Sequence, residues 1–563
     1  MAEDFMTAAV KRVEAQFEKS GVSENCAAFE RKENQIEMRD GVKLHTIYYF
    51  PKEDTAEEKT YPVILTRTCY PGNDRIHRAY GEGLARRGYV YVYQYCRGRE
   101  NSEGKWEPNI NERKDGIDTM NYLVEQPWCE ILGYWGHSYT SMTGWAFADA
   151  AEGKVAAMFL EDYGTDRFTS AYEKGCFRHD ILTAWSMENA EKPVNADYRE
   201  SCRYLPQIEV DEALWGQRVP SYREYITSPN PDAALWQTGW WKQLREIPSK
   251  TKVPIYLLSG WYDHHHGSSM KTWERLNEET KQHSWLEIGA WNHFFQICLE
   301  GKEVMHPQNE EIPKMLEWFE LTLKQKEIPT QRIRAYEIGA DRWIDTVSDG
   351  LGEKGTAGSM TLYLDEKTLR TDTPEQEKTR NYTFDPADPV ESIGGEALLH
   401  TMPQIGSHLQ PESDYREDVL SFVSEPLEET FTLNGKASVR LFVESDCEDT
   451  AFTAKIMEVT PEGKAYNIRS SIATLEQGKT EAGAYEPGSV AEVQITMWNI
   501  VYTIPKGSRI RVDVSSSDFP QYHVHSNQKG LWSEKTENKI AHQTIHMGGE
   551  AASCVILPLM KKQ

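Results

Sequence analysis

The sequence lacks several features that mark exported or membrane-bound proteins. No uncharged apolar run approaches the roughly 18 residues that a membrane-spanning helix needs. The nine cysteines include no C-x-x-C pair, and an odd, scattered set fits reduced thiols better than a disulfide framework. The opening MAEDFMTAAVKRVEAQFEK carries charges throughout, where a secretory signal needs an apolar core. We therefore expect a cytoplasmic protein without a membrane partner.

Positive charge is also scarce. Lysine and arginine number 62 against 88 aspartates and glutamates, which gives a net charge of −26. A field of this sign repels phosphate backbones, so nucleic acid is excluded as a partner. The hydrophobic fraction of 39% and the aromatic fraction of 11% suffice for packed cores. At roughly 150 residues per domain, the length of the chain predicts two to four domains.

The first part of the chain has the pattern of an α/β fold. Residues 1–34 read as an N-terminal helical segment, and Asp40-Gly41 marks the turn of a β-hairpin. Short apolar runs then alternate with helical stretches, which predicts a mainly parallel sheet covered by helices on both faces. This domain comprises residues 35–164 and 251–330. Between them, residues 165–250 have helical spacing without strands and indicate an inserted helical cap.

The pattern changes after residue 330. Period-two runs such as SMTLYLD, SVRLFVES, AEVQITMW and SRIRVDVSSS follow one another, separated by glycine, proline and aspartate turns. Many short strands at such spacing are typical of an all-β sandwich. We predict a jelly-roll domain over residues 331–563.

The sharpest local signal for chemistry is the segment GYWGHSYTS around Ser138. A strand that ends in small-x-Ser and continues as a helix pushes the serine out above the carboxyl edge of the sheet, and Gly136 leaves room for the sharp turn. The backbone N–H of Tyr139, at the start of the helix, then faces an oxyanion formed at the serine. The motif departs from the usual pattern because Thr140 stands where a glycine is expected.

Two other residues occur at the ends of later strands. Asp263 follows VPIYLLSGWY, and His293 follows SWLEIGAWN. The chain order Ser138, Asp263, His293 is that of an α/β-hydrolase triad. In such a site His293 takes the proton of Ser138, while Asp263 fixes the tautomer of the imidazole.

Other interpretations of these residues remain open. Asp263 could instead cap a helix that begins near His264, and His293 could be a loop histidine bonded to the backbone. The run His264-His265-His266 suggests a metal site, but consecutive side chains diverge and no second ligand cluster accompanies it. We therefore expect no metal and no cofactor.

Several further motifs resemble the CocE/NonD family of α/β-hydrolases, which contains cocaine esterases, X-Pro dipeptidyl-peptidases, α-amino-acid ester hydrolases and glutaryl acylases. The similar segments run over most of the chain: RTCY, CRGRENSEGKW, EQPWC, GHSY, GWYD, GAWNHF, GADRW, YTFDPADPVESIGG and SSSDFPQY. Two positions depart from the family pattern. Ser141 stands where the family usually has glycine, and Tyr95-Cys96 precedes Arg97 where the family usually has aspartate.

The resemblance implies roles for individual residues. Ser138 matches the nucleophile, Asp263 the orienting acid and His293 the base. Tyr70 matches the tyrosine whose hydroxyl completes the oxyanion hole beside the Tyr139 N–H. A neutral O–H donor aimed at the developing oxygen charge is physically suited to that task.

Cap aromatics supply candidates for a substrate pocket. Most of the cap tryptophans are expected to pack the cap onto the sheet domain, while one or two line an apolar acyl or aryl pocket. We name His137, Trp185 and Trp261 as pocket candidates.

The leading functional hypothesis is a serine esterase that acts on a small-molecule ester through an acyl-enzyme. An amidase or aminopeptidase of X-Pro dipeptidyl-peptidase or acylase type is the alternative, for which Glu161-Asp162 and acidic residues of the cap could bind a substrate ammonium group. A non-catalytic ligand-binding protein is a remote third hypothesis. A homodimer is a further prediction.

Overall fold

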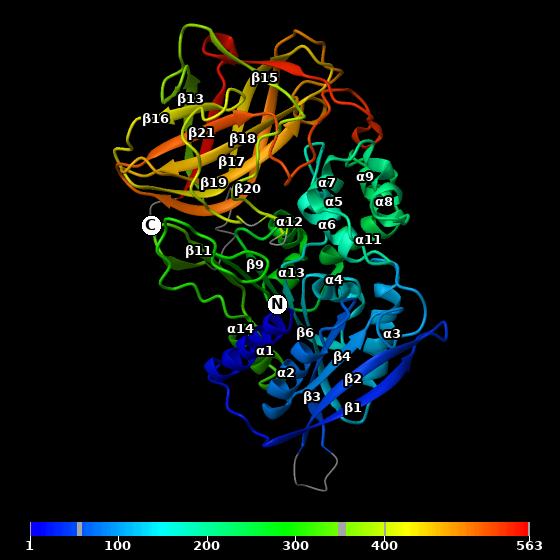
Figure 1. Ribbon diagram of the computed structural model, residues 1–563. Helices are drawn as coiled ribbons and strands as arrows, with labels where there is room; N and C mark the ends of the chain where they lie inside the picture. Colours follow the sequence, from blue (N-terminus) through cyan, green and yellow to red (C-terminus); the bar gives the residue numbers. More distant parts are fainter. Residues whose placement is uncertain (1, 53–58, 347–355, 399–400, 403, 561–563) are drawn as a thin grey trace.

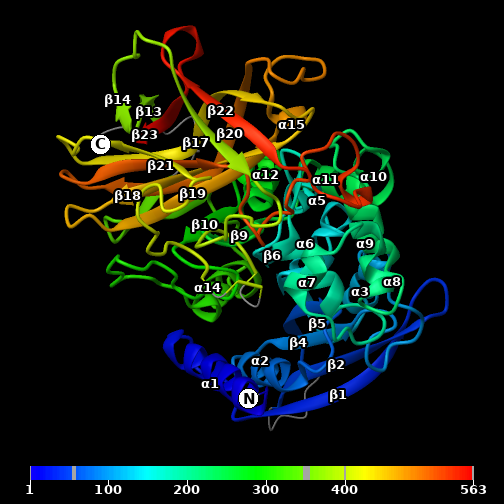
Figure 2. The ribbon, with the colours of Figure 1, turned by 45° about the horizontal axis from the view of Figure 1, so that its top comes forward.

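The computed structural model describes residues 2–52, 59–346, 356–398, 401–402 and 404–560. The hydrolase sheet and its helices form one part, the cap lies against them, and an all-β domain covers one end (Figure 1). The cap and the β domain both approach the edge of the sheet at which the predicted triad lies (Figure 2). No helix in these ranges combines the length and apolar character that crossing a bilayer requires.

A ten-stranded sheet forms the centre of the hydrolase domain, with the strand order β1-β2-β4-β3-β5-β6-β9-β10-β11-β12. The neighbours from β4 to β11 run parallel, whereas β1, β2 and β12 add antiparallel edges. The strands are β1 (Ala28–Glu37), β2 (Lys43–Lys52), β3 (Tyr61–Thr68), β4 (Val90–Tyr95), β5 (Cys129–His137), β6 (Val155–Glu161), β9 (Ile255–Gly260), β10 (Trp285–Gly289), β11 (Arg332–Glu337) and β12 (Arg342–Thr346).

Helices cover both faces of this sheet, because its central strands are apolar on both sides. Every residue of β4, VYVYQY, is buried. One face packs against α1 (Ala2–Lys19), α2 (Asp74–Arg86) and α14 (Glu311–Phe319). The other packs against α3 (Glu112–Val124), α4 (Tyr139–Trp145) and α12 (His266–Arg275). The predicted layered α/β architecture is confirmed.

The cap between β6 and β9 is mainly helical. It contains α5 (Arg167–Ala171), α6 (His179–Glu188), α7 (Tyr198–Arg203), α8 (Val210–Ala213), α9 (Pro220–Ile226), α10 (Ala234–Gln237), α11 (Gly239–Lys250) and the two-residue strands β7 (Tyr172–Glu173) and β8 (Cys176–Phe177). Trp215, Trp236 and Trp241 are buried in its core. These tryptophans therefore hold the cap together, as the packing interpretation expects.

The β domain is an eleven-stranded sandwich of jelly-roll type, in which β17 pairs with β20, β22 and β23. Its strands are β13 (Thr356–Asp365), β14 (Thr368–Arg370), β15 (Lys378–Phe384), β16 (Leu420–Ser424), β17 (Phe431–Ser445), β18 (Ala451–Val459), β19 (Ala465–Thr474), β20 (Ala491–Ile504), β21 (Arg509–Ser515), β22 (Ala541–Met547) and β23 (Cys554–Met560). Two short helices remain outside these layers, α13 (Glu278–Lys281) in the hydrolase domain and α15 (Leu475–Gly478) in the β domain.

Two predicted boundaries are wrong. The N-terminal helix ends at Lys19, and residues 28–37 form β1 instead of continuing a helical segment to residue 34. Most of β1 is exposed, so it is a strand because it pairs with β2 and not because of its own apolar pattern. The β domain does not begin at residue 331, because β11 pairs with β10 and β12 with β11 in the hydrolase sheet. An edge strand of that sheet and a sandwich strand share the same period, so the sequence pattern could not separate them.

Candidate active site

Ser138 occupies a sharp turn between β5 and α4. Its backbone has φ 57° and ψ −125°, and its N–H donates to the carbonyl of Glu161 at 3.0 Å. Gly136 is required at this turn, because a Cβ atom there would lie 2.2 Å from the carbonyl oxygen of Thr140. This is the strained strand–turn–helix that presents a nucleophile above a sheet.

Thr140 fits where a glycine was expected. Its hydroxyl accepts a hydrogen bond from the N–H of His137 at 2.6 Å and lies 2.7 Å from the His137 carbonyl, to which it donates. The phenol of Tyr134 donates to the Thr140 carbonyl at 2.7 Å. The threonine therefore closes the turn with its side chain.

The three predicted triad residues meet at the carboxyl edge of the sheet. The hydroxyl of Ser138 lies 2.9 Å from Nε2 of His293, and Nδ1 of His293 lies 2.5 Å from Oδ2 of Asp263. The second oxygen of Asp263 accepts the backbone N–H of His265 at 2.6 Å. Asp263 is fully buried and His293 nearly so. The carboxylate thus holds the imidazole with Nε2 directed at the serine.

Tyr70, just beyond the end of β3, lies on the other side of Ser138. Its phenol oxygen accepts a hydrogen bond from the indole N–H of Trp185 at 3.4 Å. Burial raises the pKa of Tyr70, whereas hydrogen bonds with Trp185 and Ser138 lower it by less, so the phenol keeps its proton at neutral pH. It remains a neutral donor beside the nucleophile.

Tyr139 contributes its backbone to the site and its side chain to the scaffold. Its N–H belongs to the first turn of α4, where helical N–H groups lack an intrahelical acceptor. Its phenol donates to Glu112 at 2.7 Å and accepts the N–H of Asn109 at 2.9 Å. These bonds fix the start of α4 and therefore the direction of the N–H.

The structure places the two tryptophans predicted to line the pocket, Trp185 and Trp261, in different surroundings. Trp185, on α6, stacks on Tyr139 with ring centroids 5.9 Å apart and bonds to Tyr70, so it lies beside the two candidate oxyanion-hole residues, and its role in a substrate pocket stays a prediction. The prediction for Trp261 is wrong: its side chain is fully buried, and its indole N–H donates to the carbonyl of Tyr336 on β11. It follows β9 directly and packs into the core beside that strand, where it supports the sheet.

Sequence reasoning missed Trp106. Its ring lies 5.8 Å from Trp185 and 5.9 Å from Tyr139, and the guanidinium of Arg99 stacks 3.7 Å above it. Trp106 ends the motif CRGRENSEGKW, so the signal was present without an assigned role. It adds an aromatic wall next to Trp185.

His137 links the serine turn to the loop that carries His293. Its Nε2–H donates to the main-chain carbonyl of His293 at 2.9 Å, and the two rings lie 4.7 Å apart. The side chain is 28% exposed. It therefore borders the site, but its ring holds the loop of the base instead of approaching the hydroxyl of Ser138.

The three consecutive histidines do not all diverge, because the rings of His264 and His265 lie 4.4 Å apart. His265 bonds to the hydroxyl of Ser170 at 2.9 Å, and His266 bonds to the carbonyl of Asn499 at 3.2 Å. Burial lowers the pKa of both rings. The ring of His264 lies 4.2 Å from that of His293, tilted by 39°.

Within the part of the chain that the structure describes, two groups of side chains could hold a metal ion by distance. They are His137, Asp162 and His293, and Asp263, His264 and His293, with potential ligand atoms within 4.8 Å of one another in each group. Both include His293, whose ring nitrogens already bond to Ser138 and Asp263. A metal would therefore compete with the triad.

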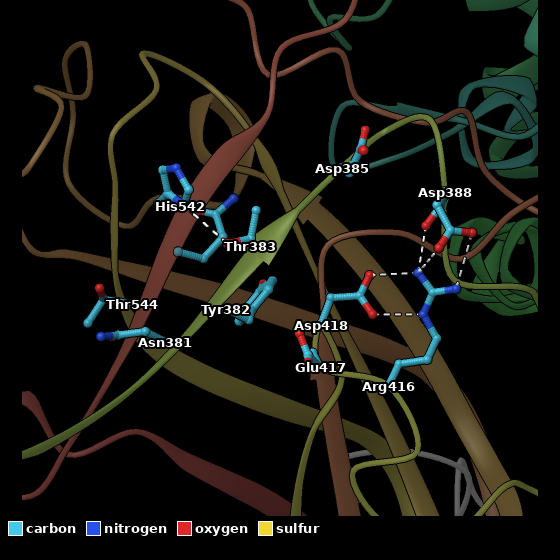
Figure 3. A pocket seen from close by; sticks show the side chains of 11 residues that line it. Asn381, Tyr382, Thr383, Asp385, Asp388, Arg416, Glu417, Asp418, His542 and Thr544 are labelled. Carbon is cyan, nitrogen blue, oxygen red and sulfur yellow. Dashed lines mark hydrogen bonds and ion pairs between the residues drawn. The ribbon is translucent and has the colours of Figure 1, made fainter.

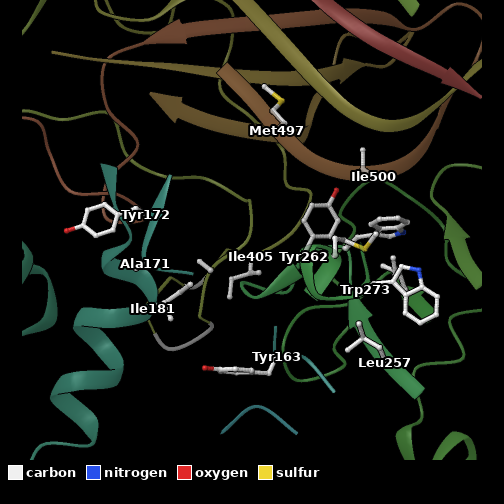
Figure 4. Close-up of a cluster of buried hydrophobic side chains, with 14 of the residues drawn as sticks. Tyr163, Ala171, Tyr172, Ile181, Leu257, Tyr262, Trp273, Ile405, Met497 and Ile500 are labelled. Carbon is white, nitrogen blue, oxygen red and sulfur yellow. The ribbon is translucent and has the colours of Figure 1, made fainter. Parts of the chain in front are cut away.

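All three parts of the molecule support the site. The buried guanidinium of Arg178, at the start of the cap, bonds to Asp180, to the carbonyl of Glu396 and to the carbonyl of His264. In Figure 4, Ile181 of the cap and Ile405 of the β domain point toward one another above Tyr163. The cap and the β domain are thus joined next to the triad.

The β domain also has a polar hollow of about 780 Å³ on its outer side. There Arg416 lies between Asp388 and Asp418 and pairs with both (Figure 3). Both carboxylates are already paired with this arginine. The hollow has no serine or cysteine nucleophile among its lining residues, so Ser138 remains the candidate centre for chemistry.

Comparisons with known proteins agree with this geometry. A family model described as X-Pro dipeptidyl-peptidase (S15 family) matches residues 40–295. A second, described as the X-Pro dipeptidyl-peptidase C-terminal non-catalytic domain, matches residues 329–556. Cocaine esterase of Rhodococcus sp. (strain MB1 Bresler) is 27% identical over 574 residues, which cover 94% of this chain and 98% of the relative.

Solved structures share the whole architecture. An α-amino acid ester hydrolase aligns with a TM-score of 0.81 at 21% identity, over 95% of this chain and 97% of its own. An aminopeptidase from the marine sediment archaeon Thaumarchaeota archaeon aligns with a TM-score of 0.80 at 21% identity, over 95% and 96% of the two chains. The chain therefore has an S15 catalytic domain followed by the C-terminal domain of X-Pro dipeptidyl-peptidases, and it is a homologue of cocaine esterase over nearly its whole length.

Proposed function

We propose that this protein is a serine hydrolase that cleaves small carboxylic esters through an acyl-enzyme. The observation that carries the proposal is the unbroken hydrogen-bonded line from Ser138 through His293 to Asp263. A serine hydroxyl with an oriented imidazole beside it is the arrangement that activates an otherwise weak nucleophile.

In the proposed reaction, the hydroxyl of Ser138 attacks the ester carbonyl while Nε2 of His293 takes its proton. Asp263 stabilises the imidazolium through Nδ1–H. The tetrahedral intermediate collapses when His293 returns the proton to the leaving alcohol, and the acyl group remains on Ser138. Water, deprotonated by His293, then attacks the acyl-enzyme and releases the acid.

The oxyanion of each intermediate receives two donors, the N–H of Tyr139 and the O–H of Tyr70. These donors come from different elements, and both are held before substrate arrives. Fixed donors in a buried site stabilise developing charge without reorganising, and removing one typically costs about 10²–10³ in kcat.

Ester cleavage is preferred over amide cleavage because an alkoxide leaving group needs less acid assistance than an amine. The amidase alternative needs an acidic site for a substrate ammonium group. The pair suggested for it, Glu161 and Asp162, is fully buried, and Glu161 accepts the indole N–H of Trp135 inside the sheet domain. This pair does not support an ammonium site, which leaves the ester as the better-supported substrate.

The test is activity of the full chain toward acyl p-nitrophenyl esters, aminoacyl esters and Xaa-Pro amides, with and without Ser138→Ala. We expect ester turnover in the native protein and a loss of about 10⁴-fold or more in kcat for Ser138→Ala. Ser141→Ala is the matched control, because it makes the same change at a buried serine in the same helix. Full ester turnover in Ser138→Ala would refute the proposal, and turnover of Xaa-Pro amides alone would favour the amidase.

We further propose that the enzyme works in a reducing compartment, the cytoplasm. No disulfide joins any of the nine cysteines, all of which lie in the described ranges, and six of them are buried. The homodimer stays a prediction that analytical ultracentrifugation can test.

A further inference from the structure

Asp162 follows β6 directly and lies between two parts of the triad. In the sheet, β6 has β5 with Ser138 on one side and β9 with Asp263 on the other. The N–H of Asp162 donates to the carbonyl of Leu258 in β9 at 2.9 Å. Its φ of 49° is in the left-handed region, which few residues other than glycine adopt without cost. The fold therefore holds this side chain at a fixed place on the edge of the sheet.

The surroundings of the Asp162 carboxyl group are unusual for an acid. The residue is fully buried, and among the described residues neither of its side-chain oxygens has a hydrogen-bond partner. The imidazole of His137 lies beside it, with Nε2 3.5 Å from Oδ2. One of its oxygens also lies within 4.8 Å of a ring nitrogen of His293. Asp263, by contrast, uses both oxygens in hydrogen bonds.

Burial without hydrogen bonds disfavours the charged form of a carboxyl group. The pKa of Asp162 is raised well above its usual value, first by burial and then by the negative charges of Asp263 and Glu311, while the backbone N–H of Gly260 lowers it by less. The ionisable groups that surround it are Asp263 on β9, Glu161 on β6, Glu311 on α14, and the rings of His137 and His293. The hydrogen bonds at this edge of the sheet go to Asp263, which accepts them with both of its oxygens.

We propose that Asp162 is a reserve orienting acid for His293: when Asp263 cannot hold the imidazole, Asp162 takes its place. The proposal rests on the proposed function of the Ser138–His293–Asp263 triad. In the native enzyme Asp162 keeps its proton. When the charge of Asp263 is removed, Asp162 releases that proton to solvent, and its carboxylate accepts the N–H of His293. A side-chain rotation shortens the gap to a hydrogen bond of about 2.8 Å.

The test compares ester hydrolysis by Asp263→Ala with that of the double variant Asp263→Ala/Asp162→Asn, across pH. We expect the single variant to keep at least about tenfold more kcat/KM than the double variant. Its activity should rise with pH as Asp162 ionises, and this rise should be absent from the double variant. Asp263→Ala/Glu161→Gln is the matched control, because it removes the preceding carboxylate, which bonds to Trp135. Equal kcat/KM and equal pH profiles in the single and double variants would overturn the proposal.

A second measurement does not depend on activity. Burial raises the pKa of Glu161 as well, so the infrared spectrum of the intact native protein should contain carbonyl bands of protonated buried carboxyl groups. The difference spectrum between the native protein and Asp162→Asn should show the loss of one such band. A native spectrum from which Asp162→Asn removes only a carboxylate band would overturn the proposal. If Asp263→Ala proves unstable, Asp263→Asn fills the same space. Full ester hydrolysis by Ser138→Ala would refute the proposed function itself. If Ser138→Ala is inactive but Asp263→Ala and Asp263→Ala/Asp162→Asn have equal kcat/KM, only the proposal for Asp162 is refuted.

Discussion

The nucleophile and the base of this site are held by contrasting means. Ser138 lies on a turn whose contacts are local: Gly136, His137 and Thr140 close it within five residues. His293 lies on a loop, residues 290–310, that is held from distant parts of the chain. We infer that the turn of Ser138 tolerates little change in its own sequence. The position of His293 depends instead on residues that are distant in the chain.

Contacts from remote segments hold the loop of His293, and three of them come from different parts of the molecule. His137 bonds to the His293 carbonyl, the guanidinium of Arg12 on α1 bonds to the Phe294 carbonyl at 3.2 Å, and Ser407 of the β domain donates its N–H to the Cys298 carbonyl at 2.8 Å. The N-terminal helix and the β domain therefore both support the base, although neither contributes a triad residue.

We expect the largest effect on activity from a substitution that disrupts the turn of Ser138. In Gly136→Ala the added methyl meets the Thr140 carbonyl, so the turn cannot close. We expect kcat/KM to fall by about 10³-fold or more, since small misplacements of catalytic groups alone cost about 10²-fold. Steady-state ester hydrolysis and thermal unfolding measure the effect.

Gly133→Ala on the same strand is the control, because its methyl meets the side-chain ends of Leu323 and Phe319, which can move. Equal activity in Gly136→Ala and Gly133→Ala would contradict the conclusion that close contacts within the turn fix the position of Ser138.

We expect a smaller effect on activity from removing a hydrogen bond that holds the loop of His293. His137→Phe keeps the ring but removes the N–H that bonds to the His293 carbonyl. We expect kcat to fall about tenfold with little change in KM, because the bond orients a catalytic group and does not contact the substrate. Unchanged kcat would show that Arg12 and Ser407 hold the loop without His137.

The smallest expected effect is a change with pH in the contribution of Asp162 to the stability of the folded protein. Because the pKa of Asp162 is higher in the folded than in the unfolded protein, its protonation contributes stability that is complete below about pH 3.9 and is lost as pH rises through the folded-state value. The melting temperature of Asp162→Asn relative to the native protein should therefore increase with pH. A difference that is constant between acid and neutral pH would contradict this assignment.

The serine turn was predictable because its signals are contiguous. Gly136, Ser138 and the helix that begins at Tyr139 are readable as one strand–turn–helix. The positions of Asp263 and His293 were also predictable, since each follows an apolar strand and parallel strands end at one edge. That edge brings together three residues spread over 156 positions of the chain.

Residues that act through distant contacts were not predictable. Trp261 was expected in the pocket because it is close to Asp263 in sequence, but its indole turns toward β11. Trp106 reaches the site only because its loop packs against Trp185 on the cap. Asp162 was considered for a substrate ammonium group, and only its burial shows that it faces the inside of the protein.

By itself, the sequence determined the layered α/β domain, the helical cap, the β-sandwich and the order of the triad, because these depend on local periodicity and on residues at strand ends. Only the tertiary structure decided that β11 and β12 belong to the hydrolase sheet, that α1 and the β domain support the loop of His293, and that a second acid lies buried beside the first. Each of these depends on pairing or burial between segments far apart in the chain, and local patterns do not encode such contacts.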